Sequence, residues 1–151
     1  MKMRNAIVIA IIALAPAALA ADFGIRAGQY RDADENFVGA EVVFDTGVLN
    51  VNPNIEYSLA DEITTGTVNL DVTIDLAQFG SVTPYAGAGV GLQYTDTDRG
   101  GEQTDLVGNL IGGVAFHLDS FKPYAQLKYF RTLDDDDGES DDFAVTIGLR
   151  F

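Results

Sequence analysis

The chain holds one histidine, His117, and no cysteine, which narrows the chemistry that its side chains could perform. A histidine can activate a serine nucleophile only when the two lie within hydrogen-bond reach. Ser58 is the one serine inside a predicted strand, and it falls on a different strand, near the end opposite to His117. We therefore expect no catalytic residues, with His117 a structural residue at a strand end. The absence of cysteine excludes disulfides, thiol chemistry and a lipid-anchored amino-terminus.

Six charged residues form a second set that could do chemistry. They are the carboxylates Glu41, Glu56 and Asp71 and the cations Arg26, Lys128 and Arg150. Each falls on the polar side of an alternating segment, so all six could meet in one interior. Three carboxylates together could be catalytic. Three cations that balance their charge would account for their presence without any substrate, because structural ion-pair networks perturb ionisable groups as readily as active sites do. We favour a structural ion-pair network.

A run of acidic residues near the carboxyl end could bind a divalent cation. The candidate ligands are Asp134, Asp135, Asp136, Asp137 and Glu139. The run does not fit a calcium-binding EF-hand loop, since aligning Gly138 with the turn glycine puts Leu133 and Ala144 at the first and last ligand positions. Weak divalent-ion binding, shared with lipopolysaccharide phosphates, remains a hypothesis. The alternative is a solvated loop of mutually repelling charges.

Alternation of apolar and polar residues predicts the elements that position these side chains. The clearest case is the last segment, DFAVTIGLRF, in which Phe143, Val145, Ile147, Leu149 and Phe151 share one face. Similar alternation predicts eight strands: Asp22–Arg31, Phe37–Asp45, Leu49–Ala60, Thr65–Leu76, Val82–Tyr94, Thr104–Leu118, Pro123–Arg131 and Asp142–Phe151. About 9 to 11 residues suffice for a tilted strand to cross a bilayer. An even number of such strands is typical of an up-and-down barrel.

One face of the predicted sheet is apolar and carries no ionisable side chain, and the other is polar and rich in glycine. A Lys or Arg on a lipid-facing strand costs about 2 to 4 kcal/mol at the bilayer midplane, so this pattern favours lipid exposure of the apolar face. We predict an all-β fold, an eight-stranded antiparallel up-and-down transmembrane β-barrel. The alternative is a soluble periplasmic ligand-binding barrel with the apolar face inward.

Several details of the barrel follow from the same pattern. A first loop that turns near Ala33 and Asp34 would set Arg26 opposite Glu41 to within a residue. Pro53 lies inside the third strand, where a missing N–H could mark a bulge. Val107 and Ile111 fall on the polar face of the sixth strand, the weakest of the eight assignments. An eight-stranded barrel is narrow enough for its own side chains to fill it, so we expect a plugged lumen.

The connections between the strands are predicted to alternate between tight turns and longer, more acidic loops. The loops after the first, third, fifth and seventh strands, with Asp105 and Asp142, hold 16 of the 23 acidic residues. The formal charge of the chain is −14. Such an acidic balance argues against nucleic acid as a partner. We expect a monomer with an acidic outer surface.

Residues 1–20 have the pattern of a cleaved secretory signal peptide. Lys2 and Arg4 precede a nine-residue apolar run, Ala6–Leu14, and Ala18-Leu19-Ala20 supplies a small-residue cleavage site. The run is too short for a membrane-spanning helix, and no later segment has a longer one. We expect residues 21–151 to form the single barrel domain.

Three segments resemble the small eight-stranded outer-membrane barrels, such as the OmpA transmembrane domain, OmpX and the opacity-type proteins of the porin family. They are VTPYAGAGVGLQY at 82–94, FKPYAQLKY at 121–129 and TIGLRF at 146–151. The resemblance implies a location in the bacterial outer membrane of a Gram-negative organism. It also implies contact with membrane lipid and lipopolysaccharide, and recognition of the terminal Phe151 by the barrel-assembly machinery.

The resemblance says little about function, because this fold serves as anchor, adhesin, defence factor and enzyme. Barrel enzymes that modify lipid A are similar in size and use a histidine with a serine, but the predicted positions of His117 and Ser58 disfavour that activity. We expect a non-enzymatic role in membrane structure or surface interaction through the acidic loops, without a cofactor.

Overall fold

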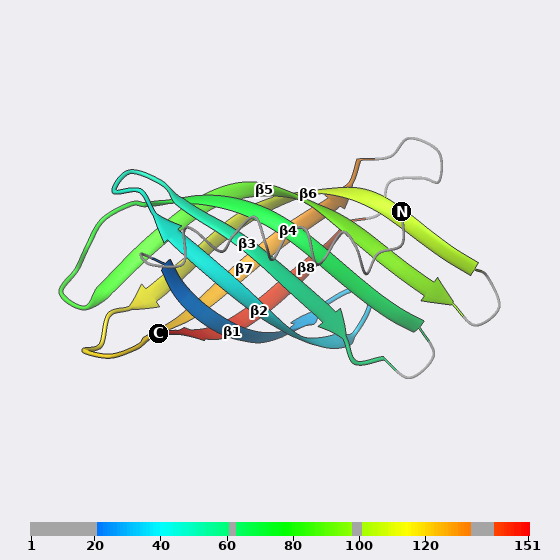
Figure 1. The fold of residues 1–151 in the computed structure, drawn as a ribbon, viewed down its shortest axis with the longest axis horizontal. Helices are drawn as coiled ribbons and strands as arrows, with labels where there is room; N and C mark the ends of the chain where they lie inside the picture. The colour runs from blue at the N-terminus through cyan, green and yellow to red at the C-terminus, as the bar shows by residue number, and fades with distance from the viewer. Residues whose placement is uncertain (1–20, 61–62, 98–100, 134–140) are drawn as a thin grey trace.

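The computed structural model describes residues 21–60, 63–97, 101–133 and 141–151, which form a closed antiparallel barrel (Figure 1). Its strands are β1 (Ala21–Tyr30), β2 (Glu35–Asp45), β3 (Asn50–Ser58), β4 (Ile63–Asp75), β5 (Val82–Thr97), β6 (Gly101–Phe116), β7 (Lys122–Thr132) and β8 (Asp141–Arg150). Each strand pairs with the next, and β8 closes the barrel on β1. The predicted fold class, an eight-stranded up-and-down barrel, is confirmed. Among the residues just given, no helix is long and apolar enough to cross a membrane.

The barrel has two distinct ends. The turn end holds the connections 46–49, 76–81 and 117–121 together with Ala21 and Phe151, whose strands lie side by side. The loop end holds the connections 31–34, 59–62, 98–100 and 133–140. In Figure 1 the turn end lies at the left, where the carboxy-terminus is marked, and the loop end lies at the right.

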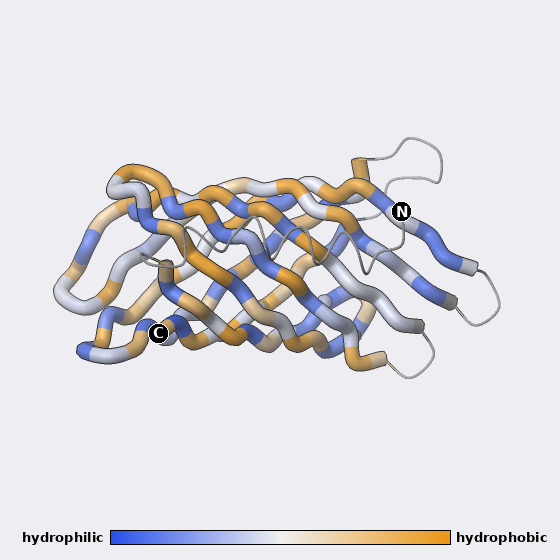
Figure 2. Tube along the Cα trace, in the orientation of Figure 1, coloured by the Kyte–Doolittle hydropathy of each residue, from blue (hydrophilic) through white to orange (hydrophobic). Residues whose placement is uncertain are grey.

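Apolar side chains cover the outside of the barrel, and polar side chains fill the inside. Ile25, Leu110, Leu127 and Ile147 are 58 to 64% exposed, whereas Glu56 and Lys128 are 4% and 2% exposed. Figure 2 shows the alternation along each strand. Water would not tolerate such a belt of exposed apolar residues on a monomer, but bilayer hydrocarbon requires one. The soluble alternative, which needed the apolar face inward, is therefore wrong.

Strand pairing extends further at the loop end than the sequence pattern indicated. β5 and β6 stay paired as far as Thr97 and Gly101, so most of the segment expected to be a long loop is strand. Of the four connections at the loop end, only 133–140 has more residues than the turns at the other end. The remaining three are as short as the turns: 31–34, 59–62 and 98–100. The predicted difference in loop length is wrong at three of the four positions because polar, exposed strand ends read as loop in the sequence.

Two local predictions about strand register are also wrong. The first connection turns one residue earlier than expected, so Arg26 pairs with Gly39 and Glu41 pairs with Gly24. No bulge occurs at Pro53, because the β3–β4 register runs through it without a shift. The β2–β3 pairing instead skips the positions opposite Asn52 and Pro53 and resumes in the same register. The missing N–H of Pro53 therefore costs pairing on one side only.

Candidate functional site

The structure brings all six charged residues of the predicted set into one network inside the barrel. Lys128 Nζ lies 2.8 Å from Glu56 Oε1 and 3.9 Å from Asp71 Oδ2. Arg26 lies between two carboxylates, 3.0 Å from Glu56 and 3.5 Å from Glu41. Arg150 Nε donates to Glu41 Oε1 at 2.8 Å. Three cations thus balance three carboxylates, and the network is electrically neutral.

Neutral side chains complete the hydrogen bonding of each carboxylate. Tyr30 donates its hydroxyl to Glu56 at 2.7 Å, and Asn52 donates to Glu41 at 2.6 Å. Asp71 accepts from Asn54 at 2.8 Å and from Asn109 at 3.0 Å. Buried charges are tolerable when they are paired and hydrogen-bonded in this way. Each carboxylate of the network thus has at least one cation and one neutral donor as partners.

An aromatic cluster that the sequence analysis missed lies between this network and the turn end. It consists of Tyr85, Ile111, Ala115 and Tyr124, all at most 7% exposed. The guanidinium of Arg150 stacks 4.1 Å from the centre of the Tyr124 ring. Tyr85 and Tyr124 stand at inward positions of their strands, so the two-residue alternation already carried the signal. Together these side chains fill the lumen on the turn-end side of the ion pairs.

A second aromatic cluster lies at the loop end. Tyr30, Phe37 and Ala144 are almost fully buried, and Phe130 packs against them. The ring centres of Tyr30 and Phe37 are 4.6 Å apart. These rings fill part of the lumen next to β1, β2 and β8 at the loop end and leave an open side, which Tyr30 and Phe130 also line.

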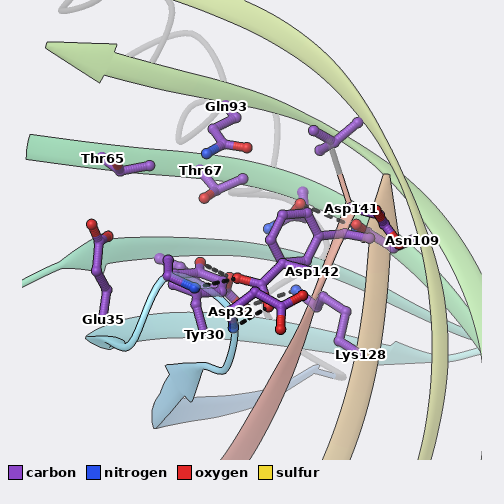
Figure 3. Close-up of a pocket in the computed structure, with 15 residues that line it drawn as sticks. Tyr30, Asp32, Glu35, Thr65, Thr67, Gln93, Asn109, Lys128, Asp141 and Asp142 are labelled. Atoms are coloured by element: carbon purple, nitrogen blue, oxygen red, sulfur yellow. Dashed lines mark hydrogen bonds and ion pairs between the residues drawn. The ribbon is translucent and has the colours of Figure 1, made fainter. Parts of the chain in front are cut away.

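The open side forms a cavity of about 330 Å³ at the loop end (Figure 3). Thr65, Thr67 and Gln93 line one wall (Figure 3), and Lys128 and Glu56 also line the cavity. Val107 and Phe130 add apolar surface. Lys128 and Glu56 of the ion-pair network are thus part of the lining of this cavity.

One acidic residue of the last predicted loop is part of the barrel wall. Asp142 is 7% exposed and accepts from the backbone N–H groups of Asp32, Ala33 and Phe143 at 2.6 to 3.3 Å. It therefore ties the connection 31–34 to β8. The candidates for divalent-ion binding, Asp134–Asp137 and Glu139, lie outside the described residues. Within the described part, no group of three or more His, Asp or Glu side chains could hold a metal ion.

His117 and Ser58 lie at opposite ends of the barrel. His117 follows β6 at the turn end, with its Nδ1 3.4 Å from the Thr83 hydroxyl. Ser58 ends β3 at the loop end and donates to Glu35 at 2.8 Å. The two residues are not brought together, so they cannot act as a base and its nucleophile.

The apolar outer surface, the closed antiparallel sheet and the charged interior define an eight-stranded transmembrane barrel of the outer-membrane type. The sequence matches no protein-family model and no curated protein. Solved structures of this class are nevertheless similar in fold. The N-terminal barrel domain of Pseudomonas aeruginosa OprF aligns over 87% of this chain and 96% of its own, with a TM-score of 0.67 and 18% identity.

Two further structures show how broad this class is. Neisserial surface protein A aligns over 86% of this chain and 92% of its own, with a TM-score of 0.67 and 15% identity. The outer-membrane enzyme PagL aligns over 86% and 98%, with a TM-score of 0.60 and 11% identity. Since one of these relatives in fold is an enzyme, the shared architecture does not by itself assign a function.

Proposed function

We propose that this protein is a non-enzymatic outer-membrane barrel that acts at the cell surface through its acidic loop end. The observation that carries the proposal is the closed, ion-paired interior surrounded by an exposed apolar belt. The belt fits a bilayer, and the three carboxylates in the centre of the barrel are all held by cations and hydrogen-bond donors. What remains to interact with other molecules is the loop end, with its exposed acidic residues and its cavity.

The orientation in the membrane is part of this proposal. We assign the turn end to the periplasm and the loop end to the outside of the cell. In a barrel with an even number of strands both chain termini lie on the same side of the membrane, and in small outer-membrane barrels the short turns lie on the periplasmic side. Acidic side chains exposed at the loop end support the assignment, among them Asp32, Asp34 and Asp96. Lipopolysaccharide with its bridging cations, and the barrel-assembly machinery at Phe151, are the proposed partners.

Refolding tests the proposal. Residues 21–151, unfolded in urea, are diluted into detergent micelles or into plain buffer, and circular dichroism and gel mobility with and without boiling are followed. We expect β-structure and a heat-dependent mobility shift only in detergent. Equal folding in buffer would show that the apolar belt is not a membrane surface and would overturn the proposal.

A charge in the apolar belt should destabilise the barrel strongly. Leu110 is 61% exposed on the outside of β6, and Leu110→Lys is expected to cost about 2 to 4 kcal/mol because the ammonium must enter hydrocarbon. Leu118, in the connection 117–121, is the matched control: Leu118→Lys should cost at most about 1 kcal/mol near the interface. Urea unfolding in micelles measures both. Equal, small losses would place Leu110 in water.

The second candidate is an outer-membrane enzyme, which the similarity in fold to PagL favours. Modification of lipid A acyl chains is the activity to test. The large separation of His117 from Ser58 weighs against it. We expect His117→Ala, expressed in cells, to leave the lipid A acylation pattern seen with the unaltered protein unchanged. A change in that pattern, with normal amounts of folded protein, would favour the enzyme.

A further inference from the structure

The cavity at the loop end is lined by hydrogen-bonding groups for which the described residues supply no partner. Thr65 is 8% exposed, lines the cavity, and its hydroxyl bonds to none of the described residues. The Asn109 side chain, 4% exposed, spends its amide N–H groups on Asn69 and Asp71, which leaves its Oδ1 facing the cavity. Gln93 also has an amide without a partner among these residues. Polar groups that face a cavity are satisfied by water or by a ligand, so these groups are available to a ligand with matching donors.

The free groups and the charges around the cavity select for a hydrogen-bond donor that is positively charged. Thr65, Gln93 and Asn109 all offer acceptor oxygens. Carboxylates line the mouth, namely Asp32, Glu35, Asp141 and Asp142. The one cation that lines the cavity, Lys128, is already held by Glu56 and Asp71. Among the described residues that line the cavity, an anion would find no positive group other than Lys128, whereas an ammonium would find several acceptors.

The apolar part of the lining adds a further requirement. Val107 and the rings of Tyr30 and Phe130 lie among the polar groups, so the ligand must present methylene groups as well as N–H donors. Thr65, Thr67 and Asn69 stand at alternate positions of β4, spread over roughly 13 Å. An elongated molecule with amines spaced by short methylene chains matches this arrangement. We propose that the cavity binds a linear polyamine of the size of spermidine.

Calorimetric titration of the protein refolded in zwitterionic micelles with spermidine tests this proposal. We expect saturable binding at one site. Thr65→Val removes the free hydroxyl and keeps the shape, and it should weaken binding about tenfold, as expected for a lost hydrogen bond to a charged group. Asp32→Asn should weaken binding several-fold. Triethylene glycol, a chain of similar length without charge, should not bind.

Matched variants separate a built site from general attraction to an acidic surface. Thr73→Val changes a threonine on the same face of β4 that does not line the cavity, and Asp119→Asn removes the same charge at the turn end. Both should bind spermidine as the unaltered protein does. Heat-dependent gel mobility checks that each variant is folded. Absence of saturable binding would overturn the proposal, as would equal weakening by Asp32→Asn and Asp119→Asn with Thr65→Val unaffected.

Discussion

Replacing Glu56 with glutamine should lower the free energy of unfolding by about 3 to 5 kcal/mol, because it leaves buried cations without their counter-charge. Glu56 accepts contacts from Lys128 at 2.8 Å, from Arg26 at 3.0 Å and from the Tyr30 hydroxyl at 2.7 Å. The side chains of Glu56 and of its two ion-pair partners, Lys128 and Arg26, are at most 2% exposed, so water replaces the lost carboxylate only poorly. The loss of this charge should therefore appear almost fully in the free energy of unfolding of the Glu56→Gln variant.

Urea unfolding in micelles, followed by circular dichroism, measures this loss; the chain has no tryptophan to report on it. Asp22→Asn is the control, because Asp22 pairs with Lys122 at the turn end where both side chains are more than a third exposed. An exposed ion pair of this kind contributes at most about 1 kcal/mol. The double variant Glu56→Gln with Lys128→Met should be more stable than Glu56→Gln alone, since it removes the unpaired ammonium. Similar small losses for Glu56→Gln and Asp22→Asn would contradict a buried network.

The change Gly87→Ala is expected to destabilise the barrel by about 3 kcal/mol, or to prevent refolding, through overpacking. A Cβ at Gly87 would overlap the backbone carbonyl oxygen of Val72 and crowd Thr73 on the neighbouring strand. A backbone atom cannot move aside as a flexible side chain can, so the β4–β5 pairing itself must shift. Such a shift would disturb the register on which the ion pairs depend.

Gly112→Ala is the matched control for Gly87→Ala. Gly112 lies on the neighbouring strand β6, and a Cβ there would meet no atom within 4 Å. Alanine should be neutral or slightly stabilising at that position, because it reduces the freedom of the unfolded chain. The yield of the heat-shifted form and the urea midpoint compare the two variants. Equal behaviour would mean that Gly87 is not needed for close strand packing.

The amino-acid sequence alone predicted the architecture of the barrel. Alternation with a period of two indicated eight strands and separated an apolar face from a polar one, because side chains of a strand point to opposite sides in turn. Absence of ionisable residues from the apolar face then indicated that this face meets lipid. The same alternation put Arg26, Glu56 and Lys128 on the inner face. These are local properties, which each strand carries within about ten residues of its own sequence.

Only the tertiary structure decided which inward residues meet. Lys128 and Glu56 are 72 residues apart in the sequence, and Arg150 and Glu41 are 109 apart. Such contacts cross the lumen, and they depend on strand tilt and stagger around the whole closed barrel rather than on any one segment. The error in the predicted register at the first turn shows what the sequence could not determine. Arg26 pairs with Gly39 across the strands and reaches Glu41 only diagonally.

The aromatic clusters and the cavity could not be predicted from the sequence either, because they too depend on the tilt and stagger of all the strands. Tyr85 and Tyr124 stood at inward positions, yet alternation could not show that they fill the turn end while a cavity stays open at the loop end. Period-two alternation thus determined which way each side chain points. Closure of the sheet, which sets how far each strand is shifted against the next, determined what that side chain finds when it points inward.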